Sequence, residues 1–326
     1  MTEQLLLNPA RKPTLEGVIR AAEKIANILP PTPLLPLTVD GQTIWCKAEC
    51  LQPIGAFKIR GGWHRLTDLN DDQRTRGVVA FSSGNHAQGV AWAAKRLGIK
   101  AIIVMPEDAP AAKLENTAKL GAEIITYDRM ADSRENIAAE IAAKNGAVVV
   151  PSFDDPWIVE GQGSAGIEIR EQMIAQTGSQ PDHLVICCGG GGLSAGISLA
   201  NPEANITIAE PEGWDDMTRS LKGGSIVPVQ DNPPATECDA LQTLIVSPLT
   251  FDILKARKAR GVAVTQGEVH LAMRVAFEQL RLVVEPGGAV ALAAILAGKA
   301  DITEKTVITI SGGNVDPKRF AKIIGA

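Results

Sequence analysis

The sequence predicts an α/β protein with two units, each a parallel β-sheet with helices on both faces. Short runs rich in β-branched and aliphatic residues alternate with alanine-rich helical segments, which is typical of βαβ units. A second series of such strands follows the first. The 326 residues, 45% of them hydrophobic, are enough to form two cores.

The elements are expected in the following order. A helix runs from Thr14, its N-cap, to Leu29 and ends at the proline cluster 30–33. The first strands are 78–81, 101–105, 123–127 and 147–150, with helices at 87–97 and 112–120 between them. The second series of strands is 184–188, 205–209, 262–265 and 306–310. Proline and polar residues near 151–156 and 231–234 mark connections that are too short for disordered linkers.

The composition excludes several classes of protein. The 32 basic and 37 acidic residues give a net charge of -5, with no Lys/Arg block suited to a phosphate backbone, so we expect no nucleic-acid partner. The longest apolar stretch, 289–297, falls well short of the roughly 20 residues of a membrane span, and the N-terminus lacks a signal pattern. We therefore expect a cytoplasmic protein without membrane contact. The five cysteines indicate buried reduced thiols.

Four consecutive glycines, Gly189, Gly190, Gly191 and Gly192, stand between the apolar run 184–188 and a predicted helix that begins at Leu193. Glycine costs about 0.5–1 kcal/mol more than alanine within regular structure, so four together indicate close approach of a ligand to the backbone. Amides at a helix N-terminus attract phosphate. The alternative is a tight connection across a neighbouring element. A phosphate site is the favoured interpretation.

The literal pattern match is a dinucleotide site. Residues 190–195 fit G-x-G-x-x-A, and Glu210 follows at the spacing of a ribose-binding carboxylate, as in an NAD-dependent oxidoreductase. Residues 161–166 also match such a pattern but follow no predicted strand, so we interpret that match as a coincidence. A Walker loop is excluded because no Gly-Lys-Ser/Thr follows the glycines. Glycine spacing alone leaves the choice between a dinucleotide and a monophosphate open.

One lysine has the surroundings of a nucleophile. Lys58 lies between Phe57 and Ile59, with glycines on either side. Desolvation favours the neutral amine, which forms Schiff bases, although a lysine lying along a helix face is the alternative. Two Ser/Gly/Asn turns, 82–86 and 311–314, follow predicted strands as the four glycines do. Together they indicate a ligand at the carboxyl edge of a parallel sheet.

In these motifs the chain resembles the fold-type II pyridoxal-phosphate enzymes, in the branch of serine/threonine dehydratases and serine racemase. The motifs follow the family's order over nearly the whole chain: Thr14-Leu15-Glu16, the Lys58 motif, 82–86, 189–192, 285–289 and 311–314. The resemblance implies two domains of the tryptophan synthase β-like kind, with the active site in the cleft between them. Residues 1–76 and 150–326 would form the large cofactor-binding domain and residues 77–149 the small substrate-side domain. It also implies a homodimer.

The resemblance assigns a role to each motif. Lys58 would bind pyridoxal 5'-phosphate covalently, the glycines with Leu193 would hold its phosphate, Asn85 would bond its ring hydroxyl, and Ser311 would face its pyridine nitrogen. The remaining cofactor-binding residues would be Phe57 and Glu285. The substrate carboxylate would be bound by Ser82, Ser83, Asn85 and His86, with Ser83 also a catalytic acid/base as in serine racemase. A neutral hydroxyl opposite the pyridine nitrogen favours elimination over transamination.

The implied reaction is dehydration and deamination of a β-hydroxy amino acid by an L-threonine/L-serine ammonia-lyase. The alternatives are an L-threo-3-hydroxyaspartate ammonia-lyase and a serine- or aspartate-type racemase. Arg134 matches an arginine of the racemase-like branch that can reach a distal carboxylate, although a solvated arginine is the alternative. A cofactor-binding protein without catalysis and the NAD-dependent oxidoreductase stay as rival functions.

A second resemblance concerns residues 210–216. They match the divalent-cation loop of the same branch, with Glu210, Asp216 and the Trp214 carbonyl as ligands. Hard oxygen ligands suit Mg²⁺, or another cation such as Ca²⁺ or Mn²⁺. A solvated acidic loop is the alternative.

Overall fold

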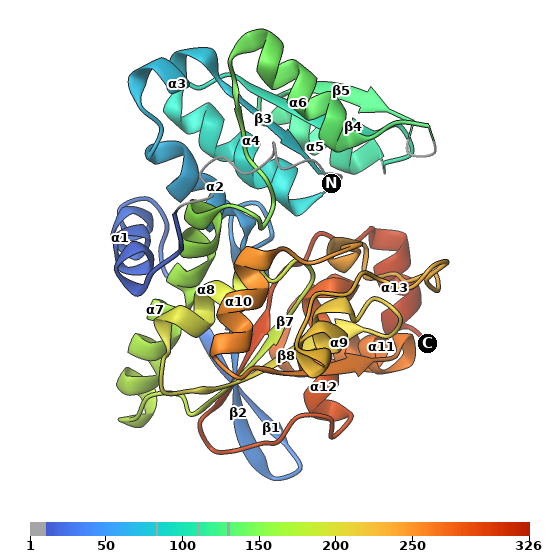
Figure 1. Cartoon of the computed structure of the whole chain (residues 1–326). Helices are drawn as coiled ribbons and strands as arrows, with labels where there is room; N and C mark the ends of the chain where they lie inside the picture. The colour runs from blue at the N-terminus through green and yellow to red at the C-terminus, as the bar shows by residue number, and fades with distance from the viewer. Residues whose placement is uncertain (1–10, 83, 110, 129–130) are drawn as a thin grey trace.

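The computed structural model describes residues 11–82, 84–109, 111–128 and 131–326 and contains two separate β-sheets. Figure 1 shows the four-stranded sheet with its helices above the six-stranded sheet, and α1, α2 and α7 beside the junction. The fold class predicted from the sequence is confirmed. The strands are β1 (Leu34–Val39), β2 (Gln42–Ala48), β3 (Val78–Phe81), β4 (Ala101–Pro106), β5 (Glu123–Tyr127), β6 (Val148–Val149), β7 (His183–Cys187), β8 (Asn205–Pro211), β9 (Arg260–Val264) and β10 (Thr306–Ile310).

The helices connect and cover these strands. They are α1 (Leu15–Ala26), α2 (Lys58–Thr67), α3 (Asp71–Arg76), α4 (Asn85–Leu97), α5 (Ala111–Lys119), α6 (Arg134–Asn145), α7 (Pro156–Thr177), α8 (Gly192–Ala200), α9 (Asp216–Gly223), α10 (Pro248–Ala256), α11 (Gln266–Val275), α12 (Pro286–Leu296) and α13 (Pro317–Ile324). Short 3-10 turns occupy Glu49–Leu51 and Asp239–Leu241, and Ala276–Leu280 is π-helical. Thr14 caps α1 by accepting a hydrogen bond from Gly17 N at 3.0 Å, as its sequence position predicts.

The six-stranded sheet has the order β1-β2-β10-β7-β8-β9. All neighbouring pairs are parallel except β1 and β2, which form an antiparallel hairpin at one edge. Neither strand is among the elements predicted from the sequence, whose pattern indicated only parallel pairing. Their turn, Asp40-Gly41, has φ values of 49° and 77°. An Asp-Gly pair with two positive φ values is a strong signal for a two-residue hairpin.

The four-stranded sheet, β5-β4-β3-β6, is parallel throughout. Its main core cluster also includes Ile59 and Leu66 of α2 and Ile158 of α7, which lie outside the stretch 77–149. Helix α2 therefore packs on the smaller sheet's layer even though it precedes that sheet in the chain. The domain boundaries at residues 76/77 and 149/150 stay a prediction.

The glycine pattern at residues 161–166 lies within α7, away from any strand end, which confirms that it is no phosphate loop. A Cβ on Gly161 would lie 2.6 Å from Gly61 Cα, and one on Gly163 would lie 2.7 Å from Gly196 O. These glycines allow α7 to approach α2 on one side and α8 on the other. In the part of the chain that the structure describes, no helix is long and apolar enough to cross a membrane.

Candidate active site

Lys58 is the first residue of α2, and its side chain is half-buried. Its Nζ donates a hydrogen bond to Ser152 O at 2.7 Å and lies 5.1 Å from the centre of the Phe57 ring. Burial lowers the pKa of Lys58 to about 8 and outweighs the opposite effect of the nearby Cys187. A substantial fraction of the amine is therefore neutral near neutral pH, as a Schiff-base nucleophile requires.

Two contacts fix the chain just before Lys58 against the end of β10. Phe57 N donates to Ser311 O at 3.1 Å, and Ala56 forms an isolated bridge with Gly312. Ser311 is buried and lies close enough to Cys187, at the end of β7, to hydrogen-bond its thiol. The lysine motif, Ser311 and the strand that precedes the four glycines therefore meet at the carboxyl edge of the larger sheet.

Buried Asn85 and Glu285, together with the half-buried Asn314, form a hydrogen-bonded bridge between the two sheets. Asn85, at the start of α4, donates through Nδ2 to Glu285 Oε1 at 2.6 Å and accepts from Asn314 Nδ2 at 2.8 Å. Glu285 Oε2 is buried without a hydrogen-bond partner among the described residues. Burial and the nearby Asp239 raise the pKa of Glu285 to about 7. The carboxyl group can therefore offer a proton or accept a hydrogen bond at this position.

The turn after β3 brings the predicted carboxylate-binding residues to the same place. Ser82 Oγ accepts from Gly84 N at 3.2 Å, and α4 begins one residue later. Ser83, the predicted acid/base, lies outside the described residues. His86 Nε2 lies 2.8 Å from Val150 O, so this nitrogen carries the proton. Burial lowers the pKa of His86 to about 3, which keeps the ring neutral.

Because the His86 ring donates to Val150, its buried Nδ1 presents only a lone pair. A lone pair repels a carboxylate. We therefore expect His86 to contribute to carboxylate binding through its backbone N–H at the start of α4, where the amides point outward from the helix end. The substrate-binding roles of Ser82, Asn85 and His86 stay predictions.

The four glycines form the connection from β7 into α8 that the sequence predicts. Gly191 is left-handed, with φ 84°, and no side chain caps α8 in the described structure. Thr250 Oγ1 donates to Gly190 O at 2.8 Å. A Cβ on Gly190 would lie 2.2 Å from the Phe153 ring. Neither Thr250 nor Phe153 was predicted as part of the site, because a threonine within a helix and a phenylalanine within a connection form no recognisable sequence motif.

Leu193, the second residue of α8, is 4% exposed. It follows the glycines directly, so its backbone N–H belongs to the first turn of the helix. The four N-terminal amides of a helix have no partner within the helix and attract anions. The connection 189–193 therefore fits a phosphate group.

An ion pair that the sequence analysis did not identify crosses between the two sheets. Lys113 of α5 is paired with Asp239 of a 3-10 turn, 126 residues further along the chain. Lys113 Nζ lies 3.6 Å from the position that a Cβ on Gly84 would take. Both charges also act on the pKa of Glu285. The pair therefore lies beside the Ser82–His86 turn and the Glu285 carboxyl.

Arg134 lies at the outer part of this region. Its guanidinium carbon is 5.6 Å above the ring of Phe81, the last residue of β3, and its Nε bonds Glu135 Oε1 at 2.8 Å. The side chain is 39% exposed, so the guanidinium is accessible to a ligand. Its position next to the strand that leads into Ser82 agrees with the predicted role, which stays a prediction.

The predicted cation loop follows β8. Glu210 is fully buried and accepts from Thr218 N at 2.7 Å, from Thr218 Oγ1 at 2.5 Å and from Met217 N at 3.2 Å. Burial raises the pKa of Glu210 well above its ordinary value. Both carboxylate oxygens of Asp216 are buried without hydrogen-bond partners among the described residues.

The donor set at this loop is small. Trp214 is buried and donates through Nε1 to Pro234 O at 2.8 Å. The predicted metal ligand is its backbone carbonyl, which takes no part in that bond. No cluster of three or more His, Cys, Asp or Glu side chains that could hold a metal exists within the described residues. The ligands of a bound cation would therefore be two carboxylates, one carbonyl and water molecules. Such an oxygen-only set suits Mg²⁺ rather than a structural zinc.

The lowered pKa of Lys58 predicts how cofactor attachment depends on pH. The neutral amine is the form that attacks an aldehyde, so the attachment rate should rise with pH through a midpoint near 8 and then level off. Stopped-flow absorbance of cofactor-free protein mixed with pyridoxal phosphate measures this rate. A midpoint above 10, the value of an ordinary lysine, would contradict the desolvated environment.

Comparisons with known proteins agree with this geometry. A family model described as "Pyridoxal-phosphate dependent enzyme" matches residues 25–313. The chain is 39% identical to the L-threo-3-hydroxyaspartate ammonia-lyase of Saccharomyces cerevisiae over 96% of each chain. It is 39% identical to the L-threonine ammonia-lyase of Thermotoga maritima, with 95% of this chain and 78% of the relative covered. The solved structure of maize serine racemase superposes with a TM-score of 0.88 at 34% identity, covering 96% of this chain and 97% of that one.

The fold and the site thus define a pyridoxal-phosphate-dependent enzyme of fold type II. The chain belongs to this family, within the branch of serine/threonine dehydratases and serine racemases. The residues fit the cofactor: a partly desolvated lysine, a glycine connection at a helix start and an unpartnered Glu285 oxygen lie around one strand edge. The family speaks for pyridoxal phosphate rather than a dinucleotide as the cofactor, and the phosphate-binding role of the four glycines stays a prediction. A cytoplasmic location, a homodimer and the absence of nucleic-acid and membrane partners stay predictions.

Proposed function

We propose that this enzyme is an ammonia-lyase that dehydrates and deaminates L-threonine or L-serine to a 2-oxo acid and ammonia. The observation that carries the proposal is that a neutral hydroxyl residue, Ser311, contacts the backbone of the segment that carries the desolvated Lys58, at one strand edge. Ser311 can bond the cofactor's ring nitrogen without favouring its protonation, and this weakens reactions that need a strong electron sink.

Pyridoxal phosphate, when bound, withdraws electrons from the α-carbon of the attached amino acid and so makes its α-proton acidic. Lys58 Nζ is the base that would accept this proton, since its pKa near 8 places the free amine close to operating pH. Asn85 and Asn314 would orient the ring through the hydrogen-bonded bridge with Glu285.

The amides at the start of α4 would hold the substrate's α-carboxylate. The ammonium group of Lys113, which is paired with Asp239, also lies beside this turn. The Phe153 ring lies against the glycine connection and would exclude water from the phosphate side. Ser83 would supply the acid/base on the face of the substrate opposite Lys58. A racemase, the alternative function, requires such a second acid/base.

A second substrate is favoured by a specific observation, the position of Arg134. A half-exposed guanidinium stacked over Phe81 lies beside the strand that leads into the carboxylate-binding turn. Arginine binds carboxylates through paired hydrogen bonds, so a dicarboxylic substrate such as L-threo-3-hydroxyaspartate would gain an anchor there. Two curated relatives at 39% identity carry that activity in their names.

The experiment is a panel of ammonia-release assays on L-threonine, L-serine and L-threo-3-hydroxyaspartate, with racemisation of L-serine followed in parallel. Arg134→Ala should lower kcat/KM for hydroxyaspartate about 10- to 100-fold, as expected for a lost charged hydrogen bond, and change the L-threonine value less than about twofold. Arg96→Ala is the matched control, because Arg96 also stacks on an aromatic ring, 4.4 Å above Trp92. An equal loss on both substrates would contradict the anchor, and no ammonia from any of the three would contradict the lyase.

We further propose that Glu210, Asp216 and the Trp214 carbonyl bind Mg²⁺ or a similar cation. The support is a buried Asp216 carboxylate with both oxygens unpartnered in the described structure, close to a second buried carboxylate. Burial raises the pKa of both carboxyl groups and so disfavours their ionised forms, and a divalent cation would stabilise those ionised forms.

Mg²⁺ at about 100 times its dissociation constant should stabilise the protein by ~2.7 kcal/mol, seen as a rise in Tm that EDTA reverses. Asp216→Asn should abolish this rise. Asp215→Asn, at the neighbouring residue that pairs with Arg219 at 3.8 Å, is the control and should retain it. A Tm response to Mg²⁺ that survives Asp216→Asn would place the cation elsewhere.

A further inference from the structure

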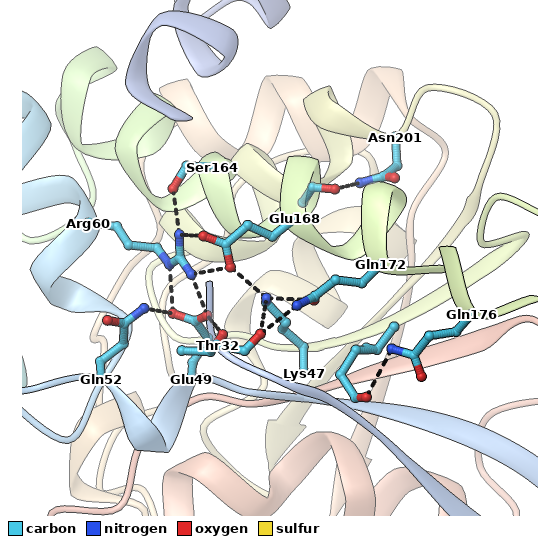
Figure 2. Close-up of polar contacts among 12 residues, drawn as sticks. Thr32, Lys47, Glu49, Gln52, Arg60, Ser164, Glu168, Gln172, Gln176 and Asn201 are labelled. Carbon is cyan, nitrogen blue, oxygen red and sulfur yellow. Dashed lines mark hydrogen bonds and ion pairs between the residues drawn. The ribbon is translucent and has the colours of Figure 1, made fainter. Parts of the chain in front are cut away.

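A buried cluster of charged side chains adjoins the helix that carries Lys58. Arg60 lies two residues after Lys58 in α2 and is completely buried. Figure 2 shows its guanidinium between Glu49, just after β2, and Glu168 of α7. The cluster therefore joins the first turn of α2 to two elements packed on the larger sheet.

The guanidinium of Arg60 uses all of its donors. Nε and Nη2 bond the two oxygens of Glu49, each at 2.7 Å, and Nη1 and Nη2 bond the two oxygens of Glu168 at 2.7 and 2.8 Å. Nη1 also donates to Ser164 Oγ at 3.0 Å. Two bidentate carboxylates and a hydroxyl fix the guanidinium plane in one orientation.

A second cation, Lys47 of β2, completes the charge balance. Its Nζ donates to Glu168 Oε2 at 2.6 Å, to Gln172 Oε1 at 2.9 Å and to Thr32 O at 2.8 Å. Two cations thus face two carboxylates. Burial alone would raise the pKa of Glu49, but Arg60 outweighs this effect and holds the pKa below its ordinary value. Lys47 shares Glu168 with Arg60 but has no hydrogen bond to α2.

Stability alone does not account for such a cluster. Replacing a buried ion network by apolar residues of similar volume is often neutral or stabilising by about 1–4 kcal/mol. A bidentate arginine instead supplies fixed geometry. Helix α2 needs that geometry, because its N-cap residue Phe57 makes no side-chain capping bond in the described structure.

The residues on both sides of Lys58 in the chain are therefore fixed by contacts. Before it, Phe57 N bonds Ser311 O and Ala56 bridges Gly312. After it, Arg60 is fixed by Glu49 and Glu168. A displacement of the Lys58 backbone would have to break one of these two sets of contacts.

We propose that Arg60, clamped by Glu49 and Glu168, is a positioning residue that sets the place of the Lys58 amine relative to the cofactor. It touches neither substrate nor cofactor and acts through the first turn of α2. The inference rests on Lys58 as the cofactor-binding lysine of the proposed function, and it is independent of which amino acid is the substrate.

The test compares Arg60→Lys with Lys47→Met in the holoenzyme. Arg60→Lys keeps the charge and loses the bidentate geometry. We expect the visible absorbance of the bound cofactor to shift and its pH profile to change. Cofactor release after dilution should accelerate about tenfold. The kcat should also fall about tenfold with KM nearly constant, as expected when a reacting group is misplaced. Absorbance and release need no substrate, so they separate failure of this inference from failure of the proposed reaction.

Lys47→Met is the matched control, because it removes the other buried cation that bonds Glu168. It should lower Tm without altering absorbance, release or kcat by more than about twofold.

Ser164→Ala covers the case in which Arg60→Lys does not fold. It removes one hydrogen bond of Arg60 and should accelerate cofactor release about two- to threefold. The proposal is overturned if Arg60→Lys and Ser164→Ala change only Tm, or if Lys47→Met changes absorbance and release as much as they do.

Discussion

Replacing Lys58 by alanine should abolish the covalent attachment of pyridoxal phosphate and lower the lyase rate by at least ~10³-fold, because one amine is both the attachment point and the base. Its half-buried position, its bond to Ser152 and its lowered pKa all indicate that role. Ammonia release measures the rate, and the visible absorbance of the purified protein measures attachment.

The control for this change is Lys95→Ala. Lys95 is an exposed lysine of α4 that bonds the carbonyl of Lys119, and its loss should leave absorbance and rate unchanged. Full activity together with a persistent visible band in the Lys58→Ala protein would show that another amine binds the cofactor. Folding is checked by far-UV circular dichroism, which should not change.

Replacing Gly191 by alanine should weaken cofactor binding about tenfold or more. An alanine at φ 84° costs roughly 1–2 kcal/mol, and about 1.4 kcal/mol corresponds to a factor of ten. The new Cβ would also lie 2.9 Å from Thr250 Cβ, in a threonine that bonds the carbonyl of Gly190. Equilibrium titration with pyridoxal phosphate, followed by absorbance, measures the dissociation constant.

Gly267→Ala is the matched control. Gly267 lies in α11, and a Cβ there would meet nothing within 4 Å. Alanine is the better helix former by about 1 kcal/mol, so Tm should hold or rise and cofactor affinity should not change. Equal affinities for the Gly191→Ala and wild-type proteins would contradict the phosphate-binding role of the glycine connection.

Much of this site could be predicted from the sequence, because its signals are local. The four glycines, the apolar neighbours of Lys58 and the Ser/Asn turns each depend on a few adjacent residues. Their placement at strand ends follows from the alternation of strands and helices, since parallel strands all end at one edge of a sheet. The hairpin β1–β2 was also readable, from Asp40-Gly41, but it was missed.

Other parts of the site depend on partners far apart in the chain. Asn85 and Glu285 are separated by 200 residues, and Lys113 and Asp239 by 126. From the sequence, Asn85 was predicted to bond a cofactor hydroxyl, and Glu285 was predicted to bind the cofactor without a fixed role. Their mutual hydrogen bond depends on how two sheets face each other, which no local pattern encodes.

The sequence by itself determined the two α/β units and predicted a reactive lysine and a glycine connection for a phosphate, because backbone propensity and desolvation act over short stretches. Only the tertiary structure decided which groups complete the site. Arg60 reads in sequence as an ordinary basic residue, yet Glu168, 108 residues away, makes it a buried anchor for the Lys58 helix. A buried charge persists only with a partner of opposite sign, and the fold alone supplies that partner.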